Sequence, residues 1–135
     1  MESALLDDAS ELPLGVEPSS ARERSLESLL AWAAEERSWL DEKLHRHGAL
    51  RLRGFDVESP EQFERFCRAI DPDLKRYVGG ESPRAVVSGR VYTSTEYPSH
   101  LEISLHNEMS YAREWPQRLY LFCARPAEEG GETQL

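Results

Sequence analysis

The chain has 135 residues, of which 39% are hydrophobic and 30% charged, a composition that fits one soluble globular domain with its own core. Acidic residues outnumber basic ones by 25 to 16, and the net charge of −9 argues against binding to nucleic acid or to an anionic membrane surface. Because the sequence has neither a long apolar run nor a basic, then apolar leader, we expect a cytoplasmic protein.

The amino-terminal part predicts an arm followed by a helix. Residues 1–20 mix acidic residues, serine and proline without a clear period, which indicates a polar arm in front of a single domain at 21–135. From Ser25, apolar residues recur at helical spacing as far as Leu44, with Ser25 as the N-cap and Gly48 as the C-terminal stop. The apolar stripe of this helix is expected to face the core.

A strand and a second helix are predicted next. Residues 48–55 alternate leucine with arginine between two glycines, which is the pattern of a half-buried strand. The helix is expected to begin after Ser59, with Pro60 at its first position and Gln62 completing a capping box. It should end at the turn residues 71–73.

The carboxyl-terminal half predicts strands and loops. Short β-favouring runs at 85–87 and 91–93 are separated by turn residues. Stronger strands are predicted at 101–111 and 118–124, and a last one begins at residue 132. Helices followed by strands indicate an α+β domain whose β part is incomplete at the last residue.

The two cysteines, Cys67 and Cys123, each lie in an apolar segment and outside any spaced cysteine framework. Free cysteine is among the residues most often found in protein interiors. We therefore predict two buried free thiols.

A histidine and a glutamate stand two residues apart in the strand predicted at 101–111. Alternation along a strand places His106 and Glu108 on one face, where an imidazole nitrogen and a carboxylate oxygen can bind one cation. This is the local half of a facial triad of two histidines and one carboxylate, which leaves positions on iron open for a cosubstrate and oxygen. The solvated polar face of an edge strand shows the same short pattern, so the pair alone does not decide between the two.

The residues around this pair resemble a known family, the taurine dioxygenase-like (TauD/TfdA) oxygenases, and in particular its SyrP-like and clavaminate-synthase-like branch. The resemblance is firm over residues 84–135 and weaker back to 48–55. It is carried by VYTSTEYP at 91–98, HNEMSY at 106–111, Pro116, LFC at 121–123, Pro126-Ala127 and GGET at 130–133.

The resemblance implies the fold and cofactors of an oxygenase. The implied fold is a double-stranded β-helix, a jelly-roll of the cupin kind, with helices in front of it and incomplete in this chain. His106 and Glu108 would bind Fe(II), with no catalytic side chain beyond the metal ligands. The Thr133 hydroxyl would help to hold the distal carboxylate of the cosubstrate 2-oxoglutarate, and O2 would be the second cosubstrate.

The resemblance also narrows the reaction. Glu108 fills a carboxylate position that related halogenases leave empty, so the expected reaction is hydroxylation or another two-electron oxidation, coupled to decarboxylation of 2-oxoglutarate to succinate and CO2. The family's second iron-binding histidine and its 2-oxoglutarate-binding arginine lie far downstream of this motif. We therefore expect the chain to be a truncated, amino-terminal portion of the oxygenase domain.

Three residues are candidates for contact with the substrate. Glu102 and Ser104 share the predicted face of His106, and Arg84 could bind a carboxylate through two hydrogen bonds. The resemblance implies a small, amino-acid-like substrate, free or carrier-bound. Two alternatives stay open: an inactive fragment of the same fold that interacts with another polypeptide, and a different metal enzyme such as a zinc hydrolase.

Overall fold

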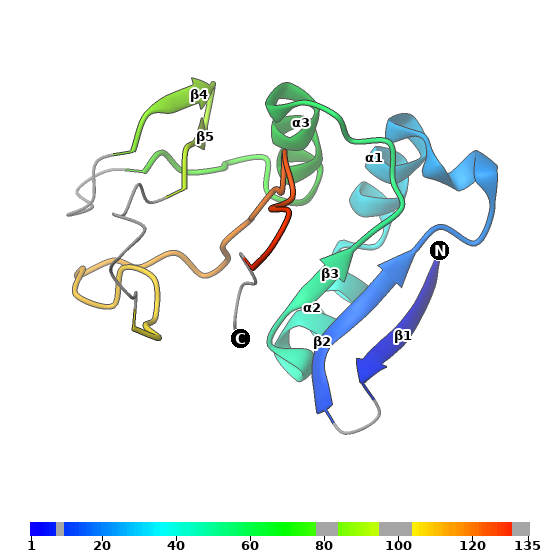
Figure 1. Ribbon diagram of the computed structural model, residues 1–135, viewed down its shortest axis with the longest axis horizontal. Helices are drawn as coiled ribbons and strands as arrows, with labels where there is room; N and C mark the ends of the chain where they lie inside the picture. Colours follow the sequence, from blue (N-terminus) through cyan, green and yellow to red (C-terminus); the bar gives the residue numbers. More distant parts are fainter. Residues whose placement is uncertain (8–9, 78–83, 95–103, 131–135) are drawn as a thin grey trace.

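The computed structural model describes residues 1–7, 10–77, 84–94 and 104–130, and combines helices with two small sheets (Figure 1). This mixture agrees with the predicted α+β class, whereas the jelly-roll barrel stays a prediction because the sheets of the described residues have three and two strands. The elements are β1 (Glu2–Asp7), β2 (Ser10–Glu17), η1 (Ala21–Arg24), α1 (Leu26–Glu35), α2 (Arg37–His47), β3 (Leu50–Leu52), α3 (Pro60–Ile70), β4 (Val86–Ser88) and β5 (Val91–Tyr92).

The amino-terminal residues form a hairpin, in which β1 and β2 are antiparallel and β3 joins β2 in parallel. Leu14 and Val16 of β2 are 6% and 0% exposed, and β2 contacts α2. Within the described residues, the segment expected as a polar arm at 1–20 therefore forms two strands of the sheet. The sequence signal for β2 is the alternation of Leu12, Leu14 and Val16, which is the period of a strand that is buried on one face.

The long helix predicted after Ser25 is two helices. Both predicted ends are confirmed, because the Ser25 side chain accepts a hydrogen bond of 3.3 Å from the backbone three residues on, and Gly48 ends α2 with a φ of 67°. Between them, Glu36 leaves helical geometry with φ −98° and ψ 24°. The apolar stripe is interrupted there, since the charged Arg37 stands where a continuous helix would place the next apolar residue after Ala33.

The strand at β3 and the helix α3 are found as predicted, and the Ser59 side chain caps α3 by accepting a hydrogen bond of 3.3 Å from the Gln62 backbone N–H.

The core lies where the three helices meet. In Figure 1, α2 lies against the three-stranded sheet, α1 packs against α3, and α3 lies between α1 and the β4–β5 hairpin. The buried residues of this core are Leu29, Ala33, Leu40, Phe66 and Cys67.

The two stronger strands predicted in the carboxyl-terminal half are absent from the described part of the chain. Residues 104–111 and 118–124 are irregular, so the prediction of strands there is wrong, and residues 101–103 and 131–135 lie outside the described residues. A strand needs a neighbour that accepts and donates its backbone hydrogen bonds. Among the described strands, the sheets β1–β2–β3 and β4–β5 do not include these segments.

Residues 118–122 instead lie against the helices. The ring of Phe122 stacks on Phe63 of α3, with centroids 5.2 Å apart and planes inclined by 19°. In the same segment, the Leu119 and Leu121 side chains are 53% and 64% exposed. The segment thus has one face on the helices and an apolar face in solvent.

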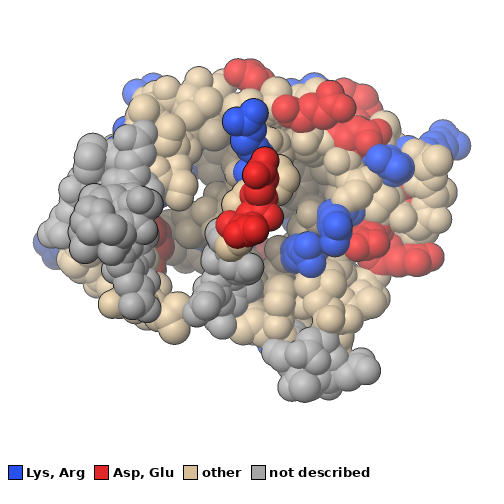
Figure 2. Space-filling model, viewed as in Figure 1, with Lys and Arg blue, Asp and Glu red and all other residues tan. Residues whose placement is uncertain are grey.

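The two cysteines differ in their exposure to solvent. Cys67 is buried as predicted, whereas Cys123 is exposed, so the prediction of a buried thiol at 123 is wrong. The segment that carries Cys123 leaves its apolar side chains Leu119 and Leu121 exposed as well. Figure 2 shows acidic and basic side chains interspersed on the face that it draws. Within the described residues, no helix is both long and apolar enough to cross a membrane.

Candidate metal site

His106 and Glu108 lie on an irregular segment that ends in a turn. Residues 104–107 are followed by a turn at 108–111, in which Met109 has a φ of 54°. The Ser110 backbone N–H donates to the Asn107 carbonyl at 3.2 Å, and the Met109 carbonyl accepts a second backbone hydrogen bond of the same kind. The turn, rather than strand alternation, therefore sets the relative positions of the two side chains.

The two predicted ligands face each other. His106 Nε2 and Glu108 Oε2 are 3.8 Å apart, and the side chains are 58% and 23% exposed. Two neighbouring ligands at right angles on one metal, with bonds of about 2.1 Å, lie about 3 Å from each other. The observed 3.8 Å is within about 1 Å of that separation.

The histidine is oriented by its other ring nitrogen. His106 Nδ1 lies 2.8 Å from the Ser104 carbonyl oxygen. A carbonyl can only accept, so Nδ1 carries the proton of this hydrogen bond. In the neutral ring the lone pair is then on Nε2, the atom that faces Glu108, which is the arrangement common for histidines that bind metal.

An arginine holds the other oxygen of the glutamate. Arg84 Nη2 donates to Glu108 Oε1 at 2.8 Å, and the Arg84 side chain is only 15% exposed. The Arg84 Cζ atom lies 4.5 Å from the centroid of the Tyr77 ring, within the range of a cation–π interaction. Burial raises the pKa of the Tyr77 phenol above its ordinary value, and the nearby Arg84 acts in the opposite direction.

Of the residues predicted for this site, the structure brings four together: His106, Glu108, Arg84 and Ser104, the last through its carbonyl group. Glu102 and Thr133 lie outside the described residues. Within the described ranges, no group of three or more His, Cys, Asp and Glu residues could hold a metal. Sequence reasoning missed Tyr77, because no spacing or motif links it to a residue 31 positions further on, at 108.

Comparisons with known proteins bear directly on this segment. The family described as "Taurine catabolism dioxygenase TauD, TfdA family" matches residues 8–135. The chain belongs to the TauD/TfdA family. The match includes the site segment and also β2 at the amino-terminal end, and it confirms the resemblance seen in the sequence.

Two curated proteins are similar to this TauD/TfdA chain. A clavaminate synthase-like protein of Arabidopsis thaliana is 40% identical over 100 residues, which are 74% of this chain and 30% of the plant protein. The dapdiamide synthesis protein DdaC of Enterobacter agglomerans is 31% identical over 96 residues, which are 71% of this chain and 29% of that protein. The chain thus spans about 30% of the length of the curated relatives that it matches.

Proposed function

We propose that His106 and Glu108 are two of the three protein ligands of Fe(II) in a 2-oxoglutarate-dependent oxygenase that hydroxylates its substrate. The observation that carries the proposal is the 3.8 Å approach of His106 Nε2 to Glu108 Oε2, with Nδ1 of the same ring on a backbone carbonyl. An imidazole nitrogen and a carboxylate oxygen are the donors that such iron sites use. Membership of the TauD/TfdA family supports the same choice of metal.

Each residue has a separate task in this proposal. Fe(II), together with 2-oxoglutarate and O2, supplies the oxidant for a C–H bond, while 2-oxoglutarate becomes succinate and CO2. His106 presents a fixed lone pair, and Glu108 contributes a negative charge that partly offsets the charge of the metal. Because His106 is 58% exposed, a metal held by its Nε2 and by Glu108 would be accessible to the third ligand and the cosubstrates.

The remaining ligands follow the family pattern as proposals. Thr133 would donate to the distal carboxylate of 2-oxoglutarate. The second histidine and the 2-oxoglutarate-binding arginine would come from the family's downstream part, in a completed double-stranded β-helix. The length of the relatives, about three times that of the matched region, is compatible with this.

The proposed substrate is a small, amino-acid-like molecule, free or carrier-bound. Glu102 and Ser104 are candidates for binding its polar groups. Arg84 is a weaker candidate for a substrate carboxylate, because one of its guanidinium nitrogens already donates to Glu108 at 2.8 Å.

The test is anaerobic binding of Fe(II) and 2-oxoglutarate by a polypeptide that joins this chain to the family's downstream histidine and arginine. We expect a weak visible charge-transfer band that is lost in His106→Ala and in Glu108→Gln. His45→Ala is the matched control, because His45 is an exposed histidine on α2 whose ring contacts only its own helix backbone in the described contacts. A band that survives His106→Ala would refute the proposed ligand. The 135-residue chain by itself should show neither the band nor succinate above the level with free iron.

A further inference from the structure

We propose that Arg84 is the positioning residue of the metal site: it holds Oε1 of Glu108 and thereby leaves Oε2 as the one oxygen that binds the metal. The inference rests on the proposed function of His106 and Glu108. It gives Arg84 a role toward the protein's own ligand instead of toward a substrate.

The first argument is the different use of the two carboxylate oxygens. Oε1 of Glu108 accepts a hydrogen bond of 2.8 Å from Arg84 Nη2, whereas Oε2 is the oxygen 3.8 Å from His106 Nε2. A carboxylate that is not held in this way can chelate a cation through both oxygens. An oxygenase with a facial triad needs open positions on iron, and a chelating Glu108 would occupy one of them. Arg84 disfavours this, because the hydrogen bond uses one lone pair of Oε1 and places a positive charge beside it.

The second argument is that Arg84 is itself held in place. Its guanidinium carbon lies 4.5 Å from the Tyr77 ring centroid, and the Tyr77 ring contacts Tyr92 of β5 with centroids 5.9 Å apart. The Arg84 side chain is 15% exposed, against 58% for His106. The guanidinium is therefore fixed on its aromatic side and can fix the carboxylate on the other, because a planar, confined donor loses little conformational freedom when it forms the hydrogen bond.

The positive charge of Arg84 opposes metal binding, whereas the orientation that Arg84 gives to Glu108 favours it. A cation beside a divalent metal weakens metal binding by repulsion, but water at the exposed His106 side screens this repulsion. Partners that orient a metal ligand typically contribute a factor of about 10–100 to metal affinity. We therefore infer that orientation outweighs repulsion and that loss of Arg84 weakens metal binding.

The experiment titrates, with Mn(II) alone, the polypeptide that joins this chain to the family's downstream histidine and arginine, and follows paramagnetic broadening of the His106 ring proton signals by NMR, with the His45 ring signals as an internal reference. In Arg84→Met we expect half-maximal broadening to need about 10-fold or more Mn(II) than in the unmodified joined polypeptide. Arg84→Lys, which keeps the charge and one donor, should fall between the two. Arg65→Met is the matched control, because Arg65 pairs with Glu27 at the surface of the helices.

A second variant covers a failure of Arg84→Met to fold, which loss of the chain's folded NMR spectrum would reveal. Tyr77→Leu keeps Arg84 and removes the ring that supports it, and we expect the Mn(II) requirement to rise by a smaller factor, about 3-fold, as expected for the loss of one cation–π contact.

The outcomes separate the inference from the function on which it rests. If Glu108→Gln abolishes the broadening while Arg84→Met leaves the Mn(II) requirement unchanged or lowers it, the positioning role is overturned and the proposed ligands stand. If Glu108→Gln changes nothing, or the unmodified joined polypeptide shows no saturable broadening at His106, the ligand assignment fails and the inference fails with it. Weakened binding in Arg84→Met and partial recovery in Arg84→Lys support the positioning role.

Discussion

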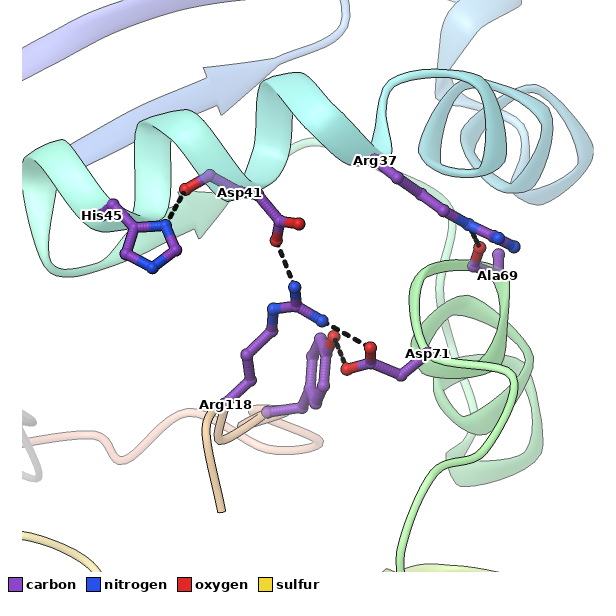
Figure 3. Close-up of polar contacts among 7 residues, drawn as sticks. Arg37, Asp41, His45, Ala69, Asp71 and Arg118 are labelled. Carbon is purple, nitrogen blue, oxygen red and sulfur yellow. Dashed lines mark hydrogen bonds and ion pairs between the residues drawn. The ribbon is translucent and has the colours of Figure 1, made fainter.

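The Tyr120 hydroxyl donates a hydrogen bond of 2.7 Å to Oδ2 of Asp71, the residue that ends α3. The other oxygen of Asp71 accepts from Arg118, and a second guanidinium nitrogen of Arg118 donates to Asp41 of α2 (Figure 3). One arginine and one tyrosine thus fasten the segment at 118–122 to two helices. This segment follows the metal-site turn after six further residues, 112–117.

Replacement of Arg118 by methionine should destabilise the chain by about 1–2 kcal/mol. Hydrogen bonds to charged groups contribute roughly 1.5–3 kcal/mol when buried, and the 26% exposure of the Arg118 side chain reduces this figure. Urea unfolding followed by circular dichroism measures the change. Arg65→Met, which removes a surface ion pair of α3, should cost less than about 0.5 kcal/mol. Equal costs in the two variants would contradict the bridging role.

The aromatic stack offers a second test of the same attachment. Phe122→Ala removes a ring that lies 5.2 Å from Phe63, and we expect a loss of about 2–3 kcal/mol in the free energy of unfolding because both buried area and the ring contact are lost. Leu121→Ala is the control from the neighbouring position, since that side chain is 64% exposed and should cost less than about 0.5 kcal/mol. A larger loss in the free energy of unfolding at 121 than at 122 would mean that the side chain of Leu121, and not that of Phe122, faces the helices.

The sequence predicts best what is decided within a few residues. The caps at Ser25 and Ser59 and the stop at Gly48 are found where they were predicted, because each involves a backbone position at most four residues away. The strands predicted at 101–111 and 118–124 fail for the opposite reason. A strand depends on partners from elsewhere in the chain, and apolar alternation does not show whether such partners are present.

The candidate site divides in the same way. His106 and Glu108 are two residues apart, so the sequence could predict that they lie close together, although a turn and not a strand brings them together. The contact of Arg84 with Glu108 spans 24 residues, and that of Arg84 with Tyr77 depends on the position of the β4–β5 hairpin beside α3. These contacts are tertiary, and no motif encodes them.

The two thiols should differ sharply in reactivity. Burial raises the pKa of the Cys67 thiol to about 12, and the residue is 2% exposed, whereas Cys123 is exposed. Because the thiolate is the reactive form, iodoacetamide at pH 8 should modify Cys123 and leave Cys67 intact until the chain unfolds. Mass spectrometry of peptides from native and urea-treated protein measures both. Labelling of Cys67 in native conditions at the rate of Cys123 would show that the helical core is open.

Tyr120 should make the fold sensitive to alkaline pH. Burial, and then the hydrogen bond to Asp71, raise the pKa of the Tyr120 phenol in the folded chain above the value of about 10 of an exposed tyrosine. Between these two pKa values the unfolded chain has lost a proton that the folded chain keeps. The contribution of Tyr120 to stability is therefore complete below pH of about 10 and declines as the pH rises further.

Urea unfolding from about pH 8 to 11 measures this decline, in a Cys67→Ala background so that the buried thiol, whose pKa is also raised, does not add to it. Tyr120→Phe should be less stable at neutral pH, because Asp71 loses a donor, and should lose less of its remaining stability above pH of about 10. Tyr77, the other tyrosine whose pKa burial raises, is present in both the parent and the variant, so its share of the slope is the same in the two. If Tyr120→Phe keeps the same slope as its parent, the proton that the folded chain retains belongs to another group, and the bond between Tyr120 and Asp71 does not control the alkaline transition.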